Sequence, residues 1–355
     1  MSVVLSCLDR NLLEHVGPYV DFNVNCYLVN CAATGGSSGS PVFSKDGEVI
    51  GVLSGGTKTT NFVIPLELPI SRGDVQAKFE QKPPSRCREL GLTDELAKAI
   101  RMDHHGVAAL LVASGILPSG PSHGKIQEGD IIVQVDGEYI THPLRLGEIL
   151  DRCVGKTLRF RPQRGASDTE VDVYVGNIYD ITPDRLVHVW GATFHTVSYQ
   201  QAMQNNLPVF GVCCAHLAGS WASECFERNS CIIDSIDYRP TPDLDTFIEV
   251  IKEIPDDARV TVGYKRFDLP GRARYAVISV NRELYPSVRE LVGNDKTGVW
   301  DTKAIQTSCR LRPRNSRRFV AGPTSSYLVE VECSMLKGVD GHNTEHSQGC
   351  GTIIG

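Results

Sequence analysis

The predicted order strand, strand, helix, strand occurs twice in the sequence, and this repeat constrains the fold more than any other feature. Its first occurrence has two strand-like apolar runs, a helical stretch and a third strand-like run, at residues 107–115, 125–137, 144–153 and 157–164. The second occurrence follows at residues 210–220, 229–242, 244–254 and 258–266. A recurring order of this kind indicates internal duplication. We therefore expect two compact units that each mix α and β structure.

The region before these units has a different character. Gly, Ser and Val are frequent over residues 20–70, where short strand-like runs alternate with turn sequences such as GGSSGS and KDG. Short strands joined by tight turns predict a β-barrel. A break at Lys82-Pro83-Pro84-Ser85 then leads into the first α/β unit, in which Thr93 is the expected N-cap of a helix over TDELAKAIR.

Charge and hydropathy exclude two classes of partner. The formal net charge of −6 lacks the basic excess of a nucleic-acid binder. No apolar run approaches the ~20 residues that span a bilayer. We expect neither nucleic acid nor a membrane as a partner. One basic cluster is interpreted as a solvated linker: Arg310, Arg312, Arg314, Arg317 and Arg318.

The 12 cysteines are scattered along the chain, which favours reduced thiols over a disulfide framework. The nearest approach to a metal site is the set Cys213, Cys214, His216, Cys225 and Cys231. Two adjacent cysteines do not match the usual spacing of zinc ligands. We therefore predict no metal and no cofactor.

The segment Gly35-Gly36-Ser37-Ser38-Gly39-Ser40-Pro41 is the most informative motif, and it fits two registers. With Ser37 reactive it matches the G-x-S-x-G elbow of α/β-hydrolases, but an elbow needs a helix directly after the serine. The sequence continues instead into a predicted β-hairpin that turns at Asp46-Gly47. In the other register the segment resembles the nucleophile loop of trypsin-like serine proteases. This resemblance implies that Ser38 is the nucleophile and that the backbone N–H groups of Gly36 and Ser38 form an oxyanion hole.

The resemblance extends downstream, where EVIGVLSGG and NFVIPLE follow the order found after the reactive serine of HtrA-type proteases. It implies that Ser54, Gly55 and Gly56 form the edge strand that pairs with the substrate backbone. Upstream, the uncharged run Ala32-Ala33-Thr34 would contribute to the specificity pocket, which implies an apolar side chain on the substrate.

A general base is not evident in the same region. Only 37 residues precede Ser38, and His15 is the sole histidine among them. His15 has no acidic partner at the spacing of a catalytic triad, and we interpret it as a surface residue. We expect these 355 residues alone to be inactive, and a full-length parent to be active.

Both α/β units resemble PDZ domains of HtrA-type proteases. In the first unit Leu90-Gly91-Leu92 and the run EGDIIVQVDG carry the likeness, which implies a loop whose N–H groups hold the carboxylate of a C-terminal peptide. The alternative is that Leu90 and Leu92 are core residues. In the second unit the carboxylate loop would be Gly191-Ala192-Thr193-Phe194.

The second unit and the C-terminal GCGTIIG resemble a fungal branch of large nuclear HtrA-like proteases in which a protease–PDZ–PDZ block is duplicated. The likeness implies a mainly β chain with α+β modules. Its expected parts are the C-terminal, nucleophile half of a trypsin-like barrel at 1–80, two PDZ-like domains at 85–177 and 178–290, a linker at 291–325, and the first strands of a second, degenerate protease-like domain at 326–355. We therefore expect the chain to be a fragment.

The implied function is that of an HtrA-type serine endopeptidase in protein quality control or apoptosis, located in the nucleus, with the cytoplasm as the alternative. Expected partners are protein or peptide substrates, including C-terminal peptides in the PDZ grooves, and a homo-oligomer is compatible with the full-length parent. A different class of function stays open, that of a non-catalytic PDZ-type module that binds peptides.

Overall fold

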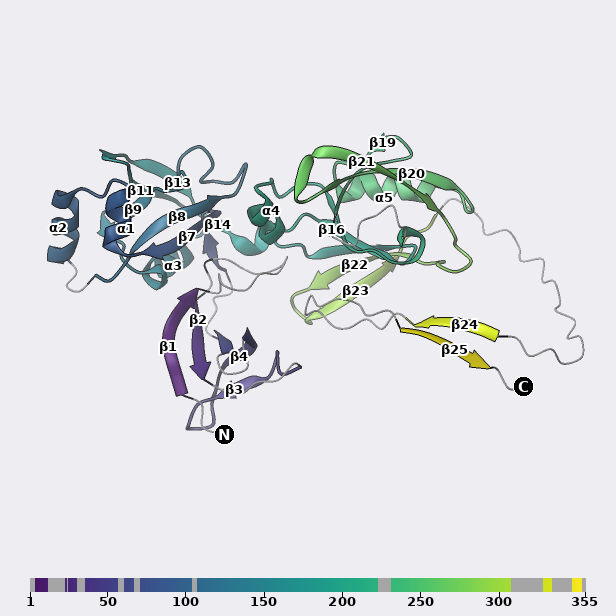
Figure 1. Cartoon of the computed structure of the whole chain (residues 1–355), viewed down its shortest axis with the longest axis horizontal. Helices are drawn as coiled ribbons and strands as arrows, with labels where there is room; N and C mark the ends of the chain where they lie inside the picture. The colour runs from purple at the N-terminus through teal and green to yellow at the C-terminus, as the bar shows by residue number, and fades with distance from the viewer. Residues whose placement is uncertain are drawn as a thin grey trace, which may run out of the picture. The chain divides into compact units, whose positions relative to one another are not determined.

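The computed structural model describes residues 4–11, 23, 25–30, 36–56, 61–66, 71–103, 107–222, 231–307, 328–333 and 347–352. They fall into two compact units, Met1–Cys309 and Arg310–Gly355. In the second of these, strands β24 (Leu328–Cys333) and β25 (Ser347–Thr352) form an antiparallel pair. The first contains three larger sheets and one short ladder (Figure 1).

A five-stranded antiparallel sheet carries the Ser38 segment. Its strands are β1 (Val4–Asn11), β2 (Asn25–Asn30), β3 (Pro41–Phe43), β4 (Val49–Gly56) and β5 (Asn61–Pro65), in the spatial order β1-β2-β5-β4-β3. Leu28 and Val29 belong to separate apolar clusters because successive side chains of a strand point to opposite faces. The predicted hairpin after Pro41 is present, and Gly47 takes a φ of +85° in its turn.

The first α/β unit is a sheet with helices on both faces. Its strands are β7 (Ala77–Lys82), β8 (Leu110–Ile116), β9 (Ile131–Val135), β10 (Glu138–Tyr139), β11 (Thr157–Arg164), β12 (Ser167–Asp168) and β13 (Val171–Tyr174). Helix α3 (Pro143–Arg152) packs on one face, and α1 (Pro84–Glu89) and α2 (Asp94–Asp103) pack on the other. The short ladder β6 (Gly73–Asp74) with β14 (Gly176–Asn177) joins the two ends of this unit.

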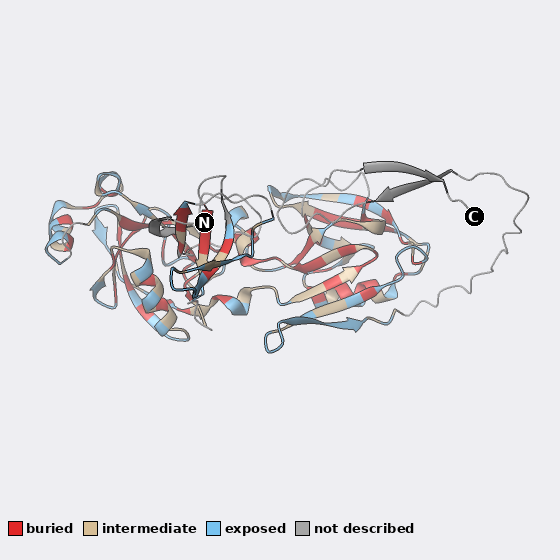
Figure 2. Ribbon diagram, turned by 90° about the horizontal axis from the view of Figure 1, so that it is seen from below, coloured by how far each residue is buried: buried red, intermediate tan, exposed pale blue. Residues whose placement is uncertain are grey.

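The second α/β unit is built on a nine-stranded sheet. Its strands are β15 (Arg185–Val189), β16 (Ala192–Thr196), β17 (Val212–His216), β18 (Cys231–Ile236), β19 (Arg239–Pro240), β20 (Arg259–Arg266), β21 (Leu269–Ser279), β22 (Val288–Asn294) and β23 (Val299–Ala304). Two α-helices, α4 (Tyr199–Asn205) and α5 (Leu244–Glu253), and two 3-10 turns, η1 (Ile178–Ile181) and η2 (Gly219–Trp221), complete it. Buried residues follow the sheets of both α/β units (Figure 2).

The order strand, strand, helix, strand occurs in both units, as β8-β9-α3-β11 and as β17-β18-α5-β20. Thr93 accepts the N–H of Leu96 at 3.3 Å, which is the N-cap geometry predicted for α2. The chain is mostly β-sheet with few helices, as the sequence predicts. Among the described residues, no helix has the length and apolarity needed to cross a bilayer.

The structure differs from two of the predicted boundaries. Strand β7 pairs with β8 along its whole length, so the first α/β unit begins before residues 80–85. Pro84 is the first residue of helix α1, a position that tolerates proline because its N–H has no partner there, and it does not mark a domain break. The predicted linker at 291–325 begins inside β22 and includes all of β23, and the hairpin of these two strands joins the sheet through the pairing of β22 with β15.

Candidate active site

Ser38 lies in a loop that is fixed to strand β4. Gly39 N–H donates to Leu53 O at 2.7 Å, and Leu53 N–H donates to Ser40 O at 2.9 Å. Ser40 N–H also donates to Ser37 O at 3.2 Å, which closes a turn around Ser38. The loop is therefore anchored to β4 directly after the serine, while the Ser38 side chain stays exposed.

The two amides expected to form an oxyanion hole have no acceptor among the described residues. Gly36 and Gly39 take φ values of +94° and +87°, a region that favours glycine, and nothing lies within 4 Å of the Cβ that either lacks. Within the described part of the chain, neither Gly36 N–H nor Ser38 N–H donates a hydrogen bond. N–H groups without an acceptor can donate hydrogen bonds to a substrate carbonyl oxygen and stabilise the negative charge that develops on it.

The hydroxyl of Ser38 has a backbone partner. Ser38 Oγ donates to Ser54 O at 3.3 Å. A carbonyl oxygen orients the hydroxyl but cannot take its proton, so this contact supplies no general base. Two predictions concern residues outside the described part of the chain: His15, interpreted as a surface residue, and the run Ala32-Ala33-Thr34, expected to contribute to the specificity pocket.

The predicted substrate strand is the last part of β4. Gly55 and Gly56 pair with Phe62 and Asn61 of β5, whereas the pairing of β4 with β3 ends at Val52. Beyond the loop contact at Leu53, no described strand pairs with the other side of Ser54–Gly56. That side can accept an extended peptide by β-strand addition next to Ser38. The sequence did not reveal the contact between Ser38 Oγ and Ser54 O, because no residue pattern encodes a hydroxyl-to-backbone bond.

The first predicted carboxylate loop is closed. Leu90 N–H donates to Arg86 O and Cys87 O, Gly91 N–H to Arg88 O at 3.0 Å, and Leu92 N–H to Cys87 O at 2.9 Å. These bonds terminate helix α1, and Leu92 is buried in the core cluster. The structure thus differs from the predicted open loop and agrees, for Leu92, with the alternative that it is a core residue.

The second predicted carboxylate loop is a hairpin turn followed by a central strand. Trp190 and Gly191 form the turn between β15 and β16, with φ values of +46° and +98°. Residues Ala192, Thr193 and Phe194 belong to β16, which is hydrogen-bonded to β15 on one side and β17 on the other. Ala192 and Phe194 are fully buried. This strand has no free edge for a peptide.

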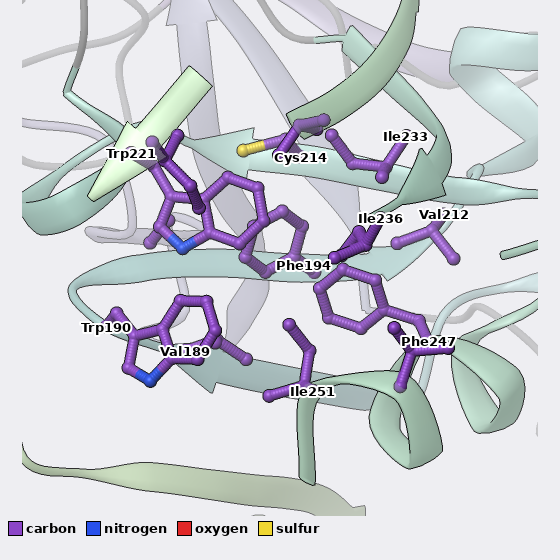
Figure 3. Packing of buried hydrophobic residues seen from close by; sticks show 14 of the residues in the cluster. Val189, Trp190, Phe194, Val212, Cys214, Trp221, Ile233, Ile236, Phe247 and Ile251 are labelled. Carbon is purple, nitrogen blue, oxygen red and sulfur yellow. The ribbon is translucent and has the colours of Figure 1, made fainter. Parts of the chain in front are cut away.

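A nearby segment covers the Gly191 turn. Ser220 N–H donates to Trp190 O at 3.0 Å, and a Cβ on Gly191 would lie 2.7 Å from Gly219 Cα. Trp221 is fully buried, with its ring centroid 4.8 Å from that of Phe194 (Figure 3). Sequence reasoning missed this closure, which involves the 3-10 turn Gly219–Trp221 that follows strand β17 after Leu217 and Ala218.

His195, Cys213 and Cys214 of the second unit are buried. His195 is buried with Nδ1 against Thr196 O, and burial lowers its pKa. Burial raises the pKa of the Cys213 thiol to about 12. Cys213 and Cys214 face opposite sides of β17, since they belong to different core clusters, and Cys225 lies outside the described residues. The described residues contain no group that could hold a metal ion.

The chain is similar to a known domain family and to known proteins. A PDZ-like domain model matches residues 180–257. The pro-apoptotic serine protease NMA111 of Phaeosphaeria nodorum is 40% identical over 382 residues, covering 100% of this chain and 38% of the relative. The corresponding protein of Aspergillus fumigatus is also 40% identical, with 100% of this chain and 37% of the relative covered.

Among solved structures, the HtrA-type protease AlgW with a decapeptide is similar at 19% identity and a TM-score of 0.35, covering 49% of this chain and 55% of that one. The chain spans less than two fifths of the length of the curated relatives named above, at 38% and 37%. Over its entire length, the chain is a homologue of the fungal pro-apoptotic serine proteases NMA111, and it contains a PDZ-like domain.

Proposed function

We propose that Ser38 is the nucleophile of a serine endopeptidase site of the HtrA type. The observation that carries the proposal is a loop that is fixed to β4 by Gly39 and Leu53 but leaves Ser38 exposed, beside two amides for which no described residue is an acceptor. Homology over the whole chain to proteins named serine proteases supports it. In this site the amides of Gly36 and Ser38 stabilise the oxyanion, and Ser54–Gly56 pair with the substrate backbone.

The chemistry needs a base that the described residues do not supply at Ser38. Attack on a peptide carbonyl forms a bond from Ser38 Oγ to the carbonyl carbon, and the hydroxyl proton must pass to a base. Ser38 Oγ bonds only to Ser54 O within the described part of the chain. We therefore propose that these 355 residues alone hydrolyse peptides at background rates, and that the active protein adds a histidine and an acid.

A chimera tests this proposal. This chain replaces the matched segment of the Phaeosphaeria nodorum relative, of which it covers 38%, so that the remainder of that protein is retained. We expect the chimera to degrade casein and to react with a fluorophosphonate probe. Ser38→Ala should lower kcat/KM by about 10⁴-fold or more, whereas the matched control Ser37→Ala should keep most of the activity. Full activity in Ser38→Ala would refute the assignment, and loss only in Ser37→Ala would favour the elbow register.

Peptide or protein binding by the PDZ-like domain is the second candidate function, supported by the domain match at residues 180–257. Because both predicted carboxylate loops are closed, we propose that C-terminal peptides bind only after these loops rearrange. Stopped-flow fluorescence anisotropy with one labelled C-terminal peptide tests this: we expect the observed binding rate to level off at high peptide concentration, and a rate that rises linearly without a plateau would contradict it.

On the basis of the family resemblance alone, we propose a location in the nucleus, with the cytoplasm as the alternative. On the same basis we propose a role in protein quality control or apoptosis. A fluorescent fusion that is excluded from the nucleus would rule out the first location.

A further inference from the structure

Strand β23 forms one edge of the nine-stranded sheet. It pairs with β22 from Ala304 opposite Arg289 to Val299 opposite Asn294, and no described strand pairs with its other side. All six of its residues are exposed, including Val299 at 59% and Trp300 at 44%. An exposed edge with apolar residues is a template on which another strand can pair.

One hydrogen bond shows which residues offer their backbone groups at this edge. Ile305 N–H donates to Val288 O at 2.9 Å, so Ile305 faces β22. The direction of the backbone groups alternates along an antiparallel strand. Consequently Trp300, Thr302 and Ala304 direct their N–H and C=O groups toward the open edge.

We propose that β23 pairs antiparallel with β23 of a second copy of this chain, with Thr302 opposite Thr302 on the twofold axis. In this register Trp300 opposes Ala304 of the second copy, so residues with outward-facing backbone groups meet each other. The whole strand is then paired. Because the dimer is isologous, each contact away from the twofold axis occurs two times.

Charge selects this register over its neighbours. Asp301 opposes Lys303 of the second copy, and the symmetry makes two such pairs. Both belong to non-hydrogen-bonded positions, where opposing side chains are closest. Moving the axis by one residue in either direction would place Asp301 opposite Asp301, or Lys303 opposite Lys303. Asn294 Nδ2 bonds to one carboxylate oxygen of Asp301 at 3.0 Å, which leaves the other oxygen for the lysine.

The pairing involves one short strand from each copy, so it buries less surface than the ~1,200 Å² of a standard stable interface. We expect a weak dimer that forms at micromolar or higher concentration. It is independent of the proposed chemistry at Ser38, because no residue of that loop takes part.

Analytical ultracentrifugation of the full chain over a concentration series tests the proposal through matched charge changes. Asp301→Lys places lysine opposite lysine twice and should raise the dimer Kd by about tenfold or more. The double change Asp301→Lys with Lys303→Asp restores opposite charges and should restore the dimer. Lys296→Asp changes the charge by as much in the turn of the same hairpin and should leave the Kd unchanged.

Thr302→Pro provides an uncharged test, because it removes an N–H that faces the open edge and leaves the bonds to β22 intact. It should abolish the dimer, with an unchanged far-UV circular dichroism spectrum and melting temperature. A monomer at every concentration would overturn the proposal, as would a dimer that resists Thr302→Pro or that the double charge change fails to restore.

Tryptophan fluorescence locates the interface independently. The chain has 3 tryptophans, and Trp190 and Trp221 are fully buried, whereas Trp300 is 44% exposed. Quenching by iodide therefore reports on Trp300. We expect quenching to fall as the concentration of the unchanged chain rises, and to stay constant for Thr302→Pro. A dimer that leaves Trp300 equally accessible would mean that another surface associates.

Discussion

Four glycines of this chain have similar positive φ values but differ in what surrounds them. Gly36 and Gly39, on either side of Ser38, have positive φ values, and nothing lies within 4 Å of the Cβ that each lacks. Gly91 and Gly191 also have positive φ values, yet a Cβ there would lie 2.3 Å and 2.7 Å from backbone atoms. The same local preference therefore produces one loop open to solvent and two that serve packing.

The two closed loops reach that state by different routes. After Gly91 the chain enters helix α2 at Asp94, and the loop amides terminate α1. After Gly191 the chain adds the five-residue strand β16 between β15 and β17. The inserted strand fills the sheet position that is absent from the first unit, where β7 pairs directly with β8. Similar element order thus does not ensure a similar binding edge.

The largest expected effect on stability comes from removing the cover of the Gly191 turn. Trp221 is fully buried, with ring centroids 6.0 Å from Trp190 and 4.8 Å from Phe194. We expect Trp221→Ala to lower the free energy of unfolding by ~3–5 kcal/mol, measured by urea denaturation. Leu284→Ala, at a residue that is 68% exposed, is the control and should change it by less than ~0.5 kcal/mol. A loss below ~1 kcal/mol in Trp221→Ala would show that this side chain does not hold the loop closed.

A pair of glycine substitutions compares closed and open loops directly. Gly91→Ala forces a Cβ to 2.3 Å from the Gly165 carbonyl carbon, and we expect it to cost ~2–4 kcal/mol of unfolding free energy. Gly39→Ala has the same conformational cost but no collision, so we expect ~1 kcal/mol. Thermal or urea unfolding measures both. Equal costs would remove the distinction between the two loops.

Acidification should weaken the second unit through His195 on strand β16. Burial lowers the pKa of His195 below the ordinary value of 6.5, so the unfolded chain binds the proton more readily than the folded one. The free energy of unfolding should therefore fall as the pH drops below ~6.5, by at most ~1.4 kcal/mol per pH unit. His188, whose pKa burial also lowers, adds to the same trend.

Urea denaturation between pH 7.5 and 5.5 measures this effect. Most carboxylates stay ionised in this range, so their titration contributes little to the change in unfolding free energy. His195→Gln should flatten part of the decline, and the exposed His216→Gln should not. A decline that is unchanged in His195→Gln would assign the pH dependence to other groups.

Local patterns predicted most of the elements. The apolar spacing and Thr93 gave α2, and the amphipathic run at 244–254 gave α5, because helix periodicity and caps are encoded within a few residues. The hairpin at Asp46-Gly47 followed from turn chemistry in the same way. The strands β22 and β23 were missed because their sequences, VRELVGN and VWDTKA, do not alternate regularly between apolar and polar residues.

The candidate site was predictable only in part. The motif at Gly36–Ser40 places small residues where the backbone must turn, so its position on a loop before a β-hairpin could be anticipated. Whether a glycine loop presents its amides depends on partners distant in sequence, such as Gly165 beside Gly91. No local pattern reports such contacts, and the two carboxylate loops were predicted to be open for this reason.

Residue-resolved amide hydrogen exchange of the full chain tests the contrast between open and closed loops most directly. The amides of Leu90, Gly91 and Leu92 donate within the chain and should exchange at least ~100-fold more slowly than their intrinsic rates. The amides of Gly36 and Ser38 should exchange close to their intrinsic rates, because no described acceptor holds them. Strong protection at Gly36 and Ser38, or free exchange at Gly91 and Leu92, would contradict the assignment of the Ser38 loop as the open, reactive one.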